Sequence, residues 1–189
     1  MSTARRPSTV TAMTLGAVLS AMLAMPASAA NTVTQTINAG TRSSSIADLT
    51  LGAVTYSHSA QSSTGTMVLT ADDSSGSGAG WNVTVLGSNF VYAGANGGTD
   101  IPAANFSVTS AAAATSTAGE PIHPIGGPKV PLTFVAPGTL DVARKTLHAE
   151  LTFGEGTYTQ NLGVSLGIPA QSRVGTYTGT MTVTISAGP

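Results

Sequence analysis

The C-terminal stretch Tyr177-Thr178-Gly179-Thr180-Met181-Thr182-Val183-Thr184-Ile185-Ser186 decides the fold class of this chain. Its large apolar residues keep a two-residue period, and small hydroxyl residues fill most positions between them. Successive side chains of a strand point to opposite faces of a sheet, so this period predicts a half-buried strand. One face is expected to enter a core, through Tyr177, Met181, Val183 and Ile185. The other face carries a row of hydroxyls, Thr178, Thr180, Thr182 and Thr184.

The same alternation recurs upstream, in residues 147–153 and 158–166. The glycines of Gly154-Glu155-Gly156 predict a hairpin turn between these two strands. Gly76-Ser77-Gly78-Ala79-Gly80 is interpreted as another hairpin connection. Shorter apolar runs predict further strands at Val33–Ile37, Ala47–Leu51, Thr66–Thr70, Gly80–Leu86, Phe106–Thr109 and Leu132–Val135.

After residue 30 no apolar helix period lasts more than about two turns. Two segments, Ser110–Gly119 and Glu120–Pro131, have the composition of loops. We therefore predict an all-β chain, folded as a single antiparallel β-sandwich of Ig-like or Greek-key type with about eight or nine short strands. Its core, between two sheets, is expected to contain Trp81, Val83, Val85, Leu151, Phe153, Leu162, Val164, Leu166, Tyr177, Met181, Val183 and Ile185.

Hydroxyl residues supply most of the polarity of the chain. Its 189 residues include 21 Ser and 29 Thr, whereas charged residues make up only 8%. The formal net charge of −1 leaves no basic surface for nucleic-acid phosphates. The absence of Cys excludes disulfides, thiolate metal sites, a Cys nucleophile and a lipidated Cys anchor. An apolar content of 41% argues against a disordered chain, so a weakly charged globular domain is expected.

The first thirty residues have the pattern of an export leader. Arg5 and Arg6 give a positive start, residues 10–25 are mostly apolar, and Ala27-Ser28-Ala29 offers the small side chains that signal peptidase requires. A membrane-spanning helix needs about 20 apolar residues, and this run is shorter and interrupted. We expect residues 1–29 to be a cleaved signal peptide and residues 30–189 to be one secreted β-sandwich domain without a transmembrane segment.

One glycine-rich pattern matches a catalytic motif and another is similar to a phosphate-binding loop without its G-K-[ST] ending, but both lie in unsuitable local structure. Gly163-Val164-Ser165-Leu166-Gly167 fits the nucleophile-elbow pattern, which requires a strand that turns sharply into a helix. Ser165 instead lies within an alternating strand and Ile168-Pro169 follows, so we interpret it as a strand serine. The loop of residues 76–80 leads into a strand, whereas a phosphate-binding loop leads into a helix N-terminus.

The acidic residues and histidines also lack the pattern of a known site. Asp72 and Asp73 enter the loop before Trp81, but their spacing differs from an EF-hand, which leaves only weak Ca²⁺ binding open. Nothing near Glu150 and Glu155 distinguishes a general acid from a base. No zinc-site spacing joins the three histidines, His58, His123 and His148. The sequence therefore predicts no catalytic residue, no cofactor and no enzyme activity.

Two blocks of the chain resemble the signature blocks of bacterial WxL surface proteins. The first contains Leu69-Thr70-Ala71-Asp72-Asp73 and then Gly78-Ala79-Gly80-Trp81-Asn82-Val83-Thr84-Val85, and it ends at Asn89-Phe90. The second begins at Ile168-Pro169-Ala170, continues through residues 175–185 and ends at Pro189. The resemblance covers residues 69–189. Where the family has two Trp-x-Leu motifs, this chain has Trp81-Asn82-Val83 and Val183-Thr184-Ile185.

The resemblance implies a secreted, β-rich protein that is extracellular and associated non-covalently with the cell wall, through peptidoglycan or another wall glycan. Trp81 is the only Trp in the chain, and it is either a core residue, which its alternation with Val83 and Val85 favours, or a platform for sugar stacking. The threonine row is the candidate binding face.

A second function class stays open, because the closing strand alone is also similar to the last strands of spore-coat and fimbrial subunits. In that reading the chain is a structural subunit of an extracellular fibre or surface assembly, joined by β-strand addition to another surface protein or to itself. The expected donated segment is Asn31–Gly40.

Overall fold

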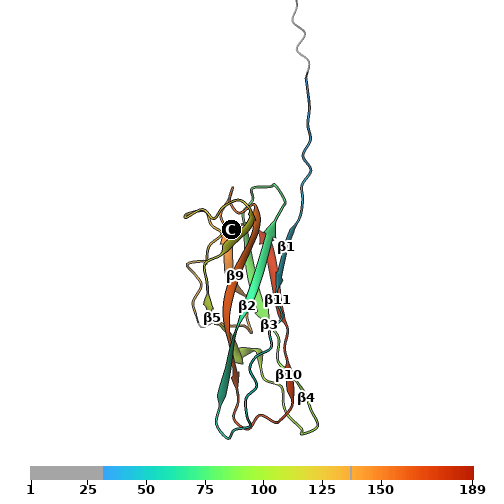
Figure 1. The fold of residues 1–189 in the computed structure, drawn as a ribbon, viewed down its shortest axis with the longest axis vertical. Coiled ribbons are helices and arrows are strands. Elements are labelled where there is room, and N and C mark those ends of the chain that lie inside the picture. The colour runs from blue at the N-terminus through green and yellow to red at the C-terminus, as the bar shows by residue number, and fades with distance from the viewer. Residues whose placement is uncertain (1–31, 137) are drawn as a thin grey trace, which may run out of the picture. The chain divides into compact units, whose positions relative to one another are not determined.

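The computed structural model describes residues 32–136 and 138–189 (Figure 1). The expected signal peptide, residues 1–29, lies outside the described residues. Ile37–Pro189 form one compact unit, and residues 32–36 lie outside it. The described residues contain one 3₁₀ turn, η1 (Ala103–Asn105), and eleven strands, β1 (Arg42–Ile46), β2 (Gln61–Asp73), β3 (Trp81–Gly87), β4 (Val91–Ala93), β5 (Phe106–Ala111), β6 (Thr115–Gly119), β7 (Gly138–Thr139), β8 (Arg144–Ala149), β9 (Gly156–Ile168), β10 (Thr176–Thr178) and β11 (Met181–Ala187).

The strands form an antiparallel β-sandwich, as predicted. One sheet has the order β1-β2-β9-β5-β7, and β6 also pairs with β9. A second sheet has the order β11-β3-β8, and β10 and β4 form a separate two-stranded ribbon. The long strands β2 and β9 pair along their whole lengths, from Gln61 opposite Ile168 to Asp73 opposite Gly156. This pair forms the centre of the first sheet. Strands β1 and β11 lie side by side where the two sheets meet (Figure 1).

The core lies between the two sheets and draws on the inward positions of both. The alternation predicted for β3 and β9 is confirmed, because Trp81, Val83 and Val85 are buried and so are Leu162, Val164 and Leu166. Trp81 and Tyr158 are the largest fully buried side chains, with ring centroids 6.0 Å apart. Partly buried residues close the edges of this core, including Tyr177, Met181, Val183 and Ile185.

Both glycine-rich connections cross from one sheet to the other, so the two hairpin predictions are wrong. Residues 74–80 join β2 of the first sheet to β3 of the second, and residues 150–155 join β8 of the second sheet to β9 of the first. Glycines with positive φ, such as Gly80 (63°) and Gly154 (84°), turn the chain in both connections. A tight glycine turn is a local feature, and it does not determine whether the next strand pairs with the last one.

The strand predicted at residues 147–153 ends earlier, at Ala149. Thr152 adopts a left-handed φ of 67°, which breaks the alternation, and Leu151 is 61% exposed rather than buried in the core. Phe153 is half-buried and stacks on His123, with ring centroids 4.5 Å apart. The turn therefore removes both side chains from the core face that their spacing predicted.

Three predicted strands are absent from the described residues, namely Val33–Ile37, Ala47–Leu51 and Leu132–Val135. Leu49 and Leu51 still pack against the core, but without strand pairing, and Leu132 is fully exposed. Four strands, β1, β4, β6 and β7, appear where none was predicted. Two of them extend the first sheet beside β2 and β9: β1, which is rich in serine, and β6, which lies within the expected loop of residues 110–119. Backbone pairing to β2 and β9 forms these strands, and apolar periodicity does not report on such pairing.

Candidate functional site

The two blocks that resemble the family signatures become neighbouring strands of one sheet. In β3 and β11, Val83 lies opposite Ile185 and Val85 lies opposite Val183, in an antiparallel register. Residues opposite each other in such a register project from the same face of the sheet. The motif positions are therefore separated by about a hundred residues in sequence but share both faces of one strand pair.

The inward face of this strand pair belongs to the core. Trp81 is completely buried, and its indole Nε1 donates a hydrogen bond of 2.8 Å to the carbonyl oxygen of Gly154. Val183 and Ile185 pack against the same core from the edge strand β11. The Trp81 ring has no exposed surface on which a sugar could stack, so the structure places it among the core residues.

The outward face of the same pair is polar except for Leu86, which lies opposite Thr182 and is exposed. We name its polar part the hydroxyl face, defined by Asn82, Thr84, Thr182, Thr184 and Ser186. Thr184 lies opposite Thr84, and Ser186 lies opposite Asn82. The three residues on β11 are exposed, and the two on β3 are half-buried. The Asn82 side-chain amide donates to the Gly188 carbonyl at 2.8 Å, which fixes the end of β11 beside β3. The face thus presents hydroxyl and amide groups on a fixed strand scaffold.

Few charges border the hydroxyl face. Lys145 on β8 lies opposite Thr84. Directly after β8, Glu150 Oε1 lies 3.3 Å from Lys129 Nζ and 3.2 Å from His148 Nε2. Hydrogen bonds from the Lys129 and His148 side chains lower the pKa of Glu150 below its ordinary value. The carboxylate of Glu150 offsets the charge of Lys129 at this border.

The predicted row of four threonines is divided between two strands. The chain leaves strand pairing at Gly179 and Thr180, so Thr178 ends in β10 and Thr182 begins the exposed positions of β11. Close packing accompanies the break, because a Cβ at Gly179 would lie 3.0 Å from the Phe90 ring. The backbone N–H of Thr180 donates to Ser88 Oγ at 2.9 Å. Only Thr182 and Thr184 therefore belong to the hydroxyl face.

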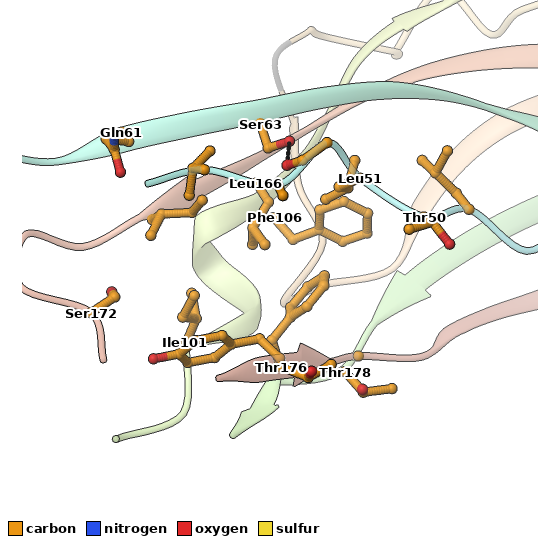
Figure 2. Close-up of a pocket in the computed structure, with 18 of the residues that line it drawn as sticks. Thr50, Leu51, Gln61, Ser63, Ile101, Phe106, Leu166, Ser172, Thr176 and Thr178 are labelled. Atoms are coloured by element: carbon orange, nitrogen blue, oxygen red, sulfur yellow. Dashed lines mark hydrogen bonds between the residues drawn. The ribbon is translucent and has the colours of Figure 1, made fainter. Parts of the chain in front are cut away.

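Thr178 and Thr180 instead line a second feature, which we name the groove (Figure 2). Its two walls are residues 46–57 and residues 172–181, and its volume is about 870 Å³. Figure 2 shows Ser63 and Leu51 on one side, Thr176 and Thr178 on the other, and the Phe106 ring between them. The floor is apolar and consists of Phe90, Ile101, Phe106, Leu166 and Ile168. The sequence did not reveal this groove, because its walls come from distant segments without a shared pattern.

The remaining candidates for chemistry have structural roles. Ser165 lies in the middle of β9, opposite Thr64 and Ser107, so it does not occupy the strand end that a nucleophile elbow requires. Asp73 forms an ion pair with Arg42 at 2.9 Å, and Asp72 accepts a hydrogen bond from Thr157. Among the residues that the structure describes, no group of three or more His, Cys, Asp or Glu side chains is arranged to hold a metal ion.

Fold and site together define an all-β sandwich domain whose prominent surfaces are a hydroxyl face and an apolar groove. A family model described as "WxL domain surface cell wall-binding" matches residues 24–189. The chain therefore belongs to the WxL family, as its two sequence blocks indicated, and it is a surface protein of the wall-associating type. Comparisons with curated proteins and with solved structures found no match. No helix in the described part of the chain is long and apolar enough to cross a membrane.

Proposed function

We propose that this protein is secreted and binds a wall polymer, either peptidoglycan or another wall glycan, non-covalently and without chemistry. The observation that carries the proposal is the pairing of the two family blocks in β3 and β11. In this pairing Trp81, Val83 and Val85 are buried and Val183 and Ile185 are half-buried. The hydroxyl face projects outward. The binding surface is thus built from the same segments that define the family.

The chemistry of the hydroxyl face suits a carbohydrate. Thr182, Thr184 and Ser186 each offer one hydroxyl that donates and accepts hydrogen bonds, and the threonine methyl groups can contact the apolar faces of sugar rings. Trp81 is buried, so the proposed binding does not use its ring. A polar, weakly charged surface of this kind recognises hydroxyl and amide groups rather than the phosphates of anionic polymers.

A wall-sedimentation assay tests the hydroxyl face. Purified walls are mixed with the wild type and with Thr182→Lys and Thr184→Lys variants, and bound and free protein are separated by centrifugation. The long, solvated lysine side chains on the face should reduce the affinity for walls by at least about tenfold, equivalent to about 1.4 kcal/mol. Circular dichroism shows whether each variant remains folded.

Matched controls use exposed threonines on the other sheet. Thr64 and Thr66 lie on β2, are exposed, and face away from the core. Thr64→Lys and Thr66→Lys add the same charge to the same protein, so they should keep wild-type binding. An equal loss of wall binding in both pairs of variants would show a general effect of the added charge. Full wall binding by the Thr182→Lys and Thr184→Lys variants would exclude the hydroxyl face as the site.

A further inference from the structure

The two walls of the groove are backbone segments that have room for a further strand. The wall of residues 46–57 continues from β1, but residues 47–57 belong to no strand. The opposite wall contains β10, which pairs with β4 and with no second strand among the described residues. An unpaired edge presents a row of backbone N–H and C=O groups that can pair with an added strand. The groove therefore lies between two segments with unused pairing capacity.

The groove also offers an apolar surface for the side chains of an added strand. Phe106, Leu166 and Ile168 lie on its floor, and the polar side chains of Gln61 and Ser63 line it as well. Charged residues are confined to Asp48 and Arg173. An uncharged, extended segment with alternating apolar residues matches this environment, because one face of such a segment can pack on the floor while its backbone pairs with the walls.

Residues 32–40 of this chain have these properties. They carry no charge, form no strand, and place Val33, Gln35 and Ile37 at alternate positions. Val33 is 95% exposed and Ile37 is 91% exposed, which is costly for large apolar side chains in water. Residue 31, the first residue of the donor segment predicted from the sequence, lies outside the described residues.

We propose that residues 32–40 of one copy enter the groove of a second copy as an added β-strand. Val33 and Ile37 then pack on the apolar floor, Gln35 meets the polar side chains of Gln61 and Ser63, and backbone hydrogen bonds form with one or both walls. Nine extended residues span about 30 Å, which covers most of the length of walls of ten or twelve residues. The proposal concerns self-association and is independent of wall binding.

The geometry of β1 favours a second copy over the same chain. Gly40 lies against Ser74, beside the first residue of β1, whereas the groove begins at Ile46, the last residue of β1. To reach its own groove the segment would have to reverse direction and pass β1, a distance of about 17 Å. Roughly four residues would then remain to enter the groove, too few to bring both Val33 and Ile37 onto its floor. A second copy imposes no such limit.

Because donor and acceptor surfaces differ, the contact is heterologous. Each copy has one donor segment and one groove, so repeated addition produces an open chain of copies unless the rotation between them closes a ring. This arrangement is the assembly alternative that the closing strand indicated, with the partner specified as a second copy of the same chain.

Light scattering after size-exclusion chromatography tests the assembly with the processed chain. The wild type should form species of two or more copies whose mass increases with concentration. A Val33→Asp/Ile37→Asp variant should be a monomer, because two carboxylates cannot enter the apolar floor. Both positions are exposed and outside the strands, so the variant should keep its fold and its sedimentation with walls. A wild type that stays monomeric overturns the proposal.

The matched control places the same charges on the opposite face of the segment. Thr34→Asp/Thr36→Asp leaves Val33 and Ile37 intact, and its carboxylates point away from the floor, so it should still associate. Association by the Val33→Asp/Ile37→Asp variant, or equal loss in both variants, overturns the proposed orientation and with it the proposal. Loss of wall binding by the hydroxyl-face variants, with normal association, would separate the two functions.

Cysteine cross-linking tests the groove itself, since the natural chain has no Cys. One preparation carries Ile37→Cys, and the other carries Thr178→Cys on a groove wall. After mixing and mild oxidation, a disulfide between them must join two copies. We expect a cross-linked dimer with Thr178→Cys and none with Thr66→Cys, an exposed position on β2 outside the groove. Equal yields at both positions, or no dimer at either, overturn the proposal.

Discussion

The indole Nε1 of Trp81 donates a hydrogen bond to the carbonyl oxygen of Gly154, and this contact ties β3 to the loop that leads into β9. The bond is 2.8 Å long and buried, so it satisfies the one polar atom of the largest core side chain. Gly154 has a φ of 84°, and a Cβ there would lie 2.9 Å from the indole nitrogen. The motif tryptophan and this glycine therefore act as one structural unit that connects the two sheets.

Replacing Trp81 by Ala should strongly destabilise the fold. The change removes the largest buried side chain and leaves a cavity beside Tyr158, at an expected cost of about 3–5 kcal/mol. Urea unfolding measures this cost when it is monitored by far-UV circular dichroism, which does not depend on tryptophan fluorescence. Trp81→Phe retains an aromatic ring but leaves the Gly154 carbonyl without its partner, so it should fall between the wild type and Trp81→Ala. An unchanged unfolding midpoint for Trp81→Ala would contradict the core assignment.

Gly154→Ala should destabilise the protein more than the same change at Gly97. Both glycines have positive φ, 84° and 64°, so both substitutions incur the backbone cost of about 1 kcal/mol. At Gly154 the new Cβ would also lie 2.5 Å from the Ala149 Cβ, whereas nothing lies within 4 Å at Gly97. The difference between the two unfolding free energies isolates the clash. Equal values would mean that the loop moves freely away from Trp81.

Sequence periodicity predicted those strands whose alternate positions face the core. β3, β9 and β11 carry long two-residue patterns, and each lies where the pattern placed it. Periodicity failed for β1, whose three consecutive serines form no pattern, because backbone pairing with β2 supports that strand. It also failed at Leu151, where a left-handed Thr152 ends the alternation. Conformations of this kind depend on the tertiary packing of the loop, which a single sequence does not report.

The two surface features differ in how far the sequence could predict them. The outward position of Thr182 and Thr184 follows directly from alternation with Val183, and the structure agrees. The groove could not be predicted, because residues 46–57 and residues 172–181 meet only after both sheets have formed. The split in the threonine row has the same origin: Gly179 packs against Phe90, and no local signal marks that contact.

Arg42→Met should destabilise the protein by about 3–5 kcal/mol, the range for breaking a buried ion pair. Arg42 Nε lies 2.9 Å from Asp73 Oδ2, and only 1% of the Asp73 side chain is exposed. Removal of the cation leaves a carboxylate buried without its charge partner. Chemical denaturation measures the cost.

The control for the Arg42 substitution is Lys129→Met. It breaks a pair of similar length with Glu150, at 3.3 Å, but both of these side chains are substantially exposed. Exposed pairs contribute about 0–1 kcal/mol, so this variant should remain close to the wild type. Similar costs for both variants would show that burial of Asp73 adds nothing to the strength of its ion pair.

Stability should fall at alkaline pH because of Tyr158. Burial, with added repulsion from Glu120, Asp73 and Glu155, raises the pKa of Tyr158 to about 12, against about 10 in an unfolded chain. Between these two values the unfolded chain loses the phenolic proton and the folded protein keeps it, so stability decreases as pH rises. Below pH 10 this contribution is complete. Urea unfolding across this range should show a smaller alkaline slope for Tyr158→Phe, and an identical slope would contradict the assignment.

Wall binding should persist at high salt if the hydroxyl face is the site. At about 0.5 M salt the Debye length falls to a few Å, so attraction between exposed protein charges and anionic wall polymers is largely lost. Thr182, Thr184 and Ser186 carry no charge, and their hydrogen bonds to sugar hydroxyls do not depend on long-range attraction. Sedimentation with purified walls across a salt series should therefore show a nearly constant bound fraction for the wild type. Release at moderate salt would instead identify an ionic contact, for which Lys145, beside Thr84, is the nearest charged residue in the strand register.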